Sequence, residues 1–240
     1  MRTIIFNYIL FGYLYLALIS FIFFQGFLTF TILLQNTLFF LFISFIIFSF
    51  FIKSHEKFFT YASIVTYCRV IINILILSII IHINEFNLIN IKNNYINVLP
   101  VLFFISLILD GLDGYLARFL NQTSKFGARF DLEADTFLLL VLSLSLYINM
   151  NVNPSIFLIP LYRYIFFFFQ IKFKWLESSL PKSIRRSFIC FFVTFLLIIC
   201  HLPSLTTYLM GALINFSILL ITFSFLKDII WLYRNKYSCN

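Results

Sequence analysis

Charged residues are scarce in this chain of 240 residues, of which 11% are Asp, Glu, Lys or Arg. In soluble globular domains the share is about a quarter. Hydrophobic residues instead make up 62% of the chain, and the mean hydropathy is +1.02. This composition excludes an ordinary soluble domain and predicts an integral membrane protein.

Cysteines are also few. The chain has Cys68, Cys190, Cys200 and Cys239, and their spacing matches no metal-binding motif. Most of them lie within apolar runs. We therefore expect small buried hydrophobic side chains here, not disulfides or catalytic thiols.

Long apolar runs separated by polar turns predict an all-α fold, a polytopic transmembrane helical bundle of about eight spans. Two N-terminal transmembrane helices (1–53) precede a membrane domain (54–240), which we expect to begin with an interfacial helix at 54–65. An Asn-rich stretch at 84–97 is predicted to be an outer loop. The eight spans are expected at about 3–24, 27–52, 66–83, 98–118, 127–146, 155–173, 187–201 and 204–230.

Basic residues are distributed unevenly over this topology. Lys92 alone lies on the predicted outer side, whereas nearly all other Lys and Arg residues lie inside or in the inner half of the membrane. The positive-inside rule then predicts that both termini are cytoplasmic, in a cell inner or cytoplasmic membrane. It also accounts for the net charge of +8 by anionic lipid, without nucleic acid.

Five of only nine acidic residues gather between Leu107 and Leu140. Asp110 and Asp113 are three residues apart, and Asp131 and Asp135 are four apart, so each pair shares one face of a helix. Glu133 falls on the opposite face from Asp131 and is set aside. If the two helices face each other, the four aspartates form a carboxylate cup.

Such a cup is expensive inside a membrane. Four uncompensated carboxylates would cost on the order of 10 kcal/mol at mid-membrane. They would also repel one another, so protonation or cations must neutralise them. Oxygen ligands without His or Cys favour Mg²⁺, Mn²⁺ or Ca²⁺, and two divalent ions would balance four carboxylates, as in two-metal phosphoryl transfer.

These residues and their neighbours form the pattern D-x2-D-G-x2-A-R-x8-G-x3-D-x3-D between Asp110 and Asp135. The pattern resembles the signature of the CDP-alcohol phosphatidyltransferase family. The resemblance covers roughly Ser63 to Lys236 and implies a core of six helices. It makes a homodimer plausible, and it leaves the role of the first two spans open.

The resemblance also implies roles for individual residues. Asp110, Asp113 and Asp131 would hold two divalent ions, Mg²⁺ or Mn²⁺, with Asp135 completing the set. Asp135 is in addition the candidate catalytic base. The CDP moiety would be contacted by a further set that provides close approach or charge: Gly114, Ala117, Arg118, Ser124 and Gly127.

A second, shorter similarity lies upstream, where Ser63, Thr66 and Arg69 form the segment S-x2-T-x2-R. It resembles the opening of the family's first core helix, in which Asn often stands in place of Ser63. Thr66, Arg69 and Asn73 lie at helical spacing on an apolar helix, so we expect them to face protein or ligand. Thr66 and Arg69 then either line the nucleotide or metal site or serve helix packing.

The predicted function is membrane-embedded transfer of a phosphatidyl group in phospholipid biosynthesis. A CDP-linked lipid such as CDP-diacylglycerol would be the donor, an alcohol the acceptor and CMP the leaving group. The alternative is a divalent-cation channel or transporter, because an intramembrane carboxylate cup can also be an ion path. Arg118 and the small residues favour the enzyme, since an ion path needs neither.

Basic residues toward the C-terminus are candidates for acceptor binding. Arg163 lies within a predicted span, so it should pair with an acid or bind an anionic substrate. The cluster at 172–186 includes Lys182, Arg185 and Arg186; it either attracts lipid headgroups or binds the acceptor. An anionic acceptor such as glycerol 3-phosphate is one possibility, and serine, inositol, inositol phosphate or a second lipid alcohol are others.

Overall fold

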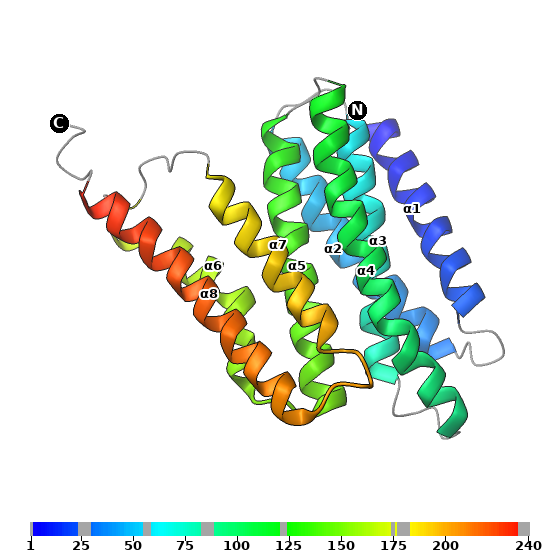
Figure 1. Cartoon of the computed structure of the whole chain (residues 1–240). Helices are drawn as coiled ribbons and strands as arrows, with labels where there is room; N and C mark the ends of the chain where they lie inside the picture. Colours follow the sequence, from blue (N-terminus) through cyan, green and yellow to red (C-terminus); the bar gives the residue numbers. More distant parts are fainter. Residues whose placement is uncertain are drawn as a thin grey trace. The chain divides into compact units, whose positions relative to one another are not determined.

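The computed structural model describes residues 2–23, 30–54, 59–82, 89–120, 124–173, 176 and 183–234. Over these ranges the chain is helical and contains no strand (Figure 1). The elements are α1 (Arg2–Phe23), α2 (Phe30–Lys53), α3 (Tyr61–His82), α4 (Ile89–Phe119), α5 (Lys125–Met150), the short 3-10 helix η1 (Pro154–Phe157), α6 (Leu158–Lys172), α7 (Ile184–Ile199) and α8 (Thr207–Arg234).

The predicted class, a polytopic helical membrane protein, is confirmed. Within the described residues, five segments are long and apolar enough to cross a membrane, by length and composition: Phe30–Lys53, Tyr61–His82, Asn97–Phe119, Pro154–Lys172 and Thr207–Arg234. α1, α5 and α7 occupy the places of the other three predicted spans.

Two predicted boundaries are wrong in the described residues. Ile89–Asn97 is not a loop but the first turns of α4; a helix can continue past the apolar layer, because its backbone hydrogen bonds are internal in any solvent. In the predicted interfacial helix, residues 55–58 lie outside the described residues, and Phe59 and Thr60 are not helical. The Thr60 hydroxyl accepts a hydrogen bond from the Ser63 amide, so Thr60 caps α3 and Tyr61 begins it.

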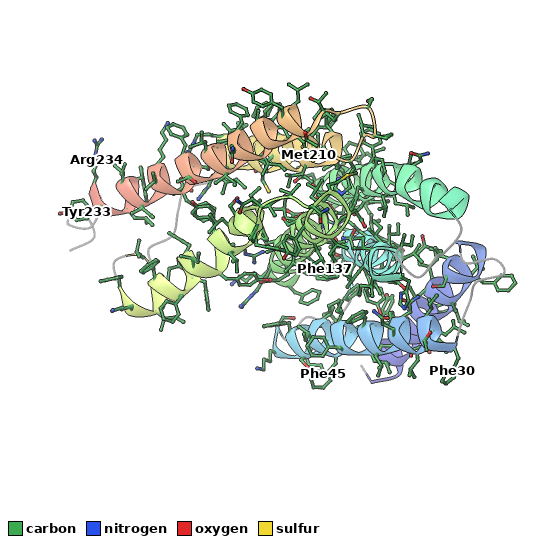
Figure 2. The ribbon with its side chains drawn as sticks, turned by 90° about the horizontal axis from the view of Figure 1, so that it is seen from below. Phe30, Phe45, Phe137, Met210, Tyr233 and Arg234 are labelled. Carbon is green, nitrogen blue, oxygen red and sulfur yellow. The ribbon has the colours of Figure 1, made fainter. Side chains whose placement is uncertain are left out.

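The chain divides into two compact units, residues 1–141 and 142–240. In the first, α3 is the central helix and contacts α1, α2 and α4 (Figure 1). Every residue from Arg69 to Ile80 is buried, as expected for a helix with packing on all sides. Phe30 and Phe45 lie on the side of α2 away from α3, largely exposed and suited to lipid (Figure 2).

In the second unit, α8 contacts both α6 and α7. The hydroxyls of Tyr162 on α6 and Thr222 on α8 lie 2.7 Å apart, and the rings of Tyr162 and Phe225 stack at 5.6 Å. α8 ends with Tyr233 and Arg234 (Figure 2).

Candidate functional site

Arg69 occupies the middle of the candidate site. Its side chain is 0% exposed, and its guanidinium group meets four carboxylates. Nη1 donates to Asp110 Oδ1 and, at 2.9 Å, to Asp135 Oδ1. Nη2 donates to Asp131 Oδ1 at 2.9 Å and lies 3.8 Å from Asp113 Oδ2. One cation of α3 is therefore shared by both aspartate pairs.

The first aspartate pair reaches Arg69 because α3 and α4 meet along a polar seam. The Ser106 hydroxyl donates to Asn73 Oδ1 at 2.9 Å, and Thr66 Oγ1 donates to Asp113 Oδ2 at 2.8 Å. Along both helices, the contact between Arg69 and Asp110 lies between these two hydrogen bonds. The stripe of Thr66, Arg69 and Asn73 thus faces protein, as its spacing predicts, because helix positions three and four apart share a face.

The second pair comes from α5, where Asp131 and Asp135 are one turn apart. Ser124 precedes this helix, and its hydroxyl accepts a hydrogen bond from the Gly127 amide at 2.8 Å. Ser124 is therefore the N-cap of α5. The cap fixes the residue at which α5 begins. It therefore also fixes the position of Asp131 and Asp135 along the helix axis, counted from that start.

The donor atoms of the aspartates suit divalent ions. Asp110, Asp113 and Asp131 each offer a carboxylate oxygen, and these atoms all lie within 4.8 Å of one another. Four carboxylates and one guanidinium carry a formal charge of −3, which calls for cations. The donors are all oxygens, which suit Mg²⁺ or Mn²⁺. Each carboxylate has two oxygens, so Arg69 and a cation can share the same aspartates.

Asp135 differs from the other three aspartates. It is not in the group whose oxygens lie within 4.8 Å of one another, and it joins the site through Arg69. Its exposure is intermediate. Its two assignments, as a fourth metal ligand and as the catalytic base, stay predictions.

The two glycines of the pattern have different surroundings. A Cβ atom built on Gly114 would meet nothing within 4 Å, so this face of α4 is open. A Cβ on Gly127 would lie 3.0 Å from Ser124 Oγ and 3.3 Å from Ser63 Oγ, so that glycine makes room for the cap. Of the other predicted CDP contacts, Ala117 is half-buried and Arg118 is exposed at the end of α4.

The predicted acceptor-binding residues belong to the second unit, and Lys182 lies outside the described residues. Arg185 Nη2 donates to Asp228 Oδ1 at 2.6 Å, and Arg186 Nη1 lies 3.7 Å from Asp228 Oδ2. Arg163, on α6, is half-buried. The two arginines of α7 thus have an acidic partner on α8, and their acceptor role stays a prediction.

Sequence reasoning missed two of these relationships. Asp228 was not singled out, although an acidic residue within a long apolar run is a functional signal. Ser106, the partner of Asn73, was also missed, because a serine in a membrane helix carries little signal. Arg69 was identified, but its pairing with all four aspartates requires knowing which helices are neighbours.

Comparison with protein families gives a match. A sequence model of the CDP-alcohol phosphatidyltransferase family matches residues 59–223, more than half of the chain. The match includes every aspartate of the site together with Thr66 and Arg69, and it leaves α1 and α2 outside. The searches of curated proteins and of solved structures found no match to this chain.

Proposed function

Since this chain belongs to the CDP-alcohol phosphatidyltransferase family, we propose that it transfers a phosphatidyl group from CDP-diacylglycerol, or a related CDP-linked lipid, to an alcohol. Membership supports a transferase role in lipid metabolism, and the apolar spans make the chain a multi-pass membrane protein. The nucleotide would enter from the cytoplasmic side while the acyl chains stay in the bilayer.

The observation that carries the proposal is the gathering of Asp110, Asp113 and Asp131 within the stretch that matches the family. These residues would hold two Mg²⁺ or Mn²⁺ ions, with Asp135 completing the set. When bound, such ions neutralise the diphosphate charge that grows as the bond to CMP breaks. Arg69 supplies the remaining positive charge from the protein itself.

The chain's own residues would position the reactants. Gly114 leaves the face of α4 open for the nucleotide, and the exposed Arg118 can pair with a phosphate. The acceptor oxygen would form a bond to the lipid-side phosphorus, and the bond from that phosphorus to CMP would break. The acceptor proton would pass to Asp135, and CMP would leave with the bonding electrons.

Arg69 also bears on the alternative of a cation path. A guanidinium group among the carboxylates is a fixed positive charge, which opposes the passage of a cation through them. The arrangement therefore favours a site that binds ions and an anionic nucleotide over one that conducts ions.

The proposal is tested with purified protein in detergent or liposomes, CDP-diacylglycerol and a panel of alcohols. The panel contains glycerol 3-phosphate, serine, inositol, inositol phosphate and a lipid alcohol. We expect CMP release that depends on one of these acceptors, with Mg²⁺ or Mn²⁺ present and not with chelator. Ion flux through liposomes without CMP formation would favour the cation path instead.

A further inference from the structure

α1 and α2 lie outside the stretch that matches the family, yet both contact α3, the helix that carries Thr66 and Arg69. The contact includes Tyr67, which stands between those two residues in the sequence and is 4% exposed. We propose that the N-terminal helix pair is a positioning element of the site and acts on α3 through Tyr67. The inference rests on the proposed function, because an effect on kcat can be measured only if the protein releases CMP.

The side chain of Tyr67 contacts α2 and the residue Phe59, which precedes α3. Its hydroxyl lies 3.0 Å from the Ser44 hydroxyl of α2, in a buried hydrogen bond. The rings of Phe40 and Phe48 on α2 lie 6.3 and 6.0 Å from its ring. The ring of Phe59, just before α3, lies 6.3 Å away. A ring enclosed in this way has little room to turn, so a push on it is passed on to the backbone of α3.

α1 also lies against Tyr67, through a glycine. A Cβ atom on Gly12 would lie 2.6 Å from Cε1 and 2.8 Å from the hydroxyl oxygen of Tyr67. Such distances are shorter than van der Waals contact, so any larger residue at this position must move the ring. α1 is itself joined to α2, where the Asn36 side-chain amide donates to the Ser20 hydroxyl at 3.3 Å.

α2 also reaches the other helix of the site, α5. The rings of Phe51 and Phe126 meet edge to face at 5.2 Å, and the guanidinium of Arg129 lies 5.0 Å from the centre of the Phe50 ring. Phe126 and Arg129 lie between Ser124, the cap of α5, and Asp131. α2 therefore contacts both α3, which carries Arg69, and α5, which carries the second aspartate pair.

The test compares two glycines within helices. Gly12→Ala places a methyl group against Tyr67, whereas Gly211→Ala in α8 places one where nothing lies within 4 Å. Turnover, KM and the metal concentration for half-maximal thermal stabilisation are measured on folded protein. For Gly12→Ala we expect about tenfold lower kcat and weaker metal stabilisation, because small displacements at a reacting centre have large kinetic effects. Gly211→Ala should match the wild type.

A conservative second change tests the hydrogen bond to α2. Tyr67→Phe keeps the ring and removes the hydroxyl that bonds to Ser44. It should lower kcat and weaken metal stabilisation, in the same direction as Gly12→Ala. If Gly12→Ala fails to fold, Ser44→Ala provides the same readouts and should also lower kcat and weaken metal stabilisation.

Several results would overturn the inference. Wild-type kcat and metal stabilisation in Gly12→Ala would do so, as would an equal loss in Gly211→Ala. If the wild type released no CMP with any acceptor, the proposed function would fail by itself. The inference would then stand or fall on whether Gly12→Ala weakens metal stabilisation.

Discussion

Arg69 and Asp135 join α3 to α5, with Nη1 of the guanidinium 2.9 Å from Oδ1 of the carboxylate. The same nitrogen donates to Asp110 of α4, so three helices meet at one atom. A buried charge needs a partner, and here one guanidinium serves carboxylates that would otherwise repel one another. Without bound metal, the site depends on Arg69 for its positive charge.

Replacing Arg69 by Gln should therefore destabilise the metal-free protein, by about 3 kcal/mol or more, as expected when one partner of a buried ion pair is removed. The melting temperature in detergent with chelator should fall. The rise in melting temperature on adding Mg²⁺ or Mn²⁺ should exceed that of the wild type, because a repelling positive charge has been lost. Arg234→Gln, at the exposed end of α8, is the control. An unchanged melting temperature in chelator would contradict the role given to Arg69.

Asp131→Asn should abolish CMP release while the protein stays folded. The change keeps the size of the side chain but weakens a metal ligand, and we expect turnover to fall by roughly a hundredfold or more. Glu133→Gln, on the opposite face of α5, should keep wild-type turnover. Near-normal turnover in Asp131→Asn would refute the metal assignment.

Thr66→Val should weaken metal binding without unfolding the protein. Its hydroxyl donates to Asp113 Oδ2 at 2.8 Å, and partners that orient metal ligands contribute about 10- to 100-fold to metal affinity or activity. The measurement is the Mg²⁺ or Mn²⁺ concentration that gives half-maximal CMP release. Thr194→Val is the control, since that hydroxyl donates to the Cys190 carbonyl within α7. Equal metal requirements in both variants would show that Thr66 does not orient Asp113.

Gly114→Ala and Gly127→Ala should have different effects. Gly114 belongs to the predicted nucleotide site, whereas Gly127 lies beside the cap of α5. Nothing lies near a Cβ at Gly114, and alanine favours helix by about 1 kcal/mol, so the melting temperature should hold or rise while KM for the CDP-lipid increases. At Gly127 the methyl group would press on Ser124 and Ser63, so the melting temperature should fall. An unchanged KM in Gly114→Ala would remove that glycine from the nucleotide site.

The helices could be predicted from sequence where their signal is local. Apolar runs predicted the order of the eight α-helices in the described part of the chain, and the spacing of Asp110, Asp113, Asp131 and Asp135 predicted two pairs on helix faces. The predicted start of α4 was wrong, because polar residues favour a loop only weakly and do not exclude a helix.

The centre of the site could be predicted only in part. An arginine in an apolar helix must have a partner, so Arg69 carried a signal. Its four partners lie 41 to 66 residues away in the chain, and their identity depends on how α3, α4 and α5 pack. For the same reason Asp228 was not linked to Arg185, which lies 43 residues earlier.

The cap at Ser124 has a consequence for how the chain can vary in length. One residue inserted between Ser124 and Asp131 would rotate the second aspartate pair by about 100° around α5 and turn it away from Arg69. Insertions before Ser124 leave that rotation unchanged. The number of residues between the cap and the aspartates is therefore fixed by the geometry of the helix. Insertions before Ser124 should leave the site intact, whereas a single residue inserted after it should disrupt the site.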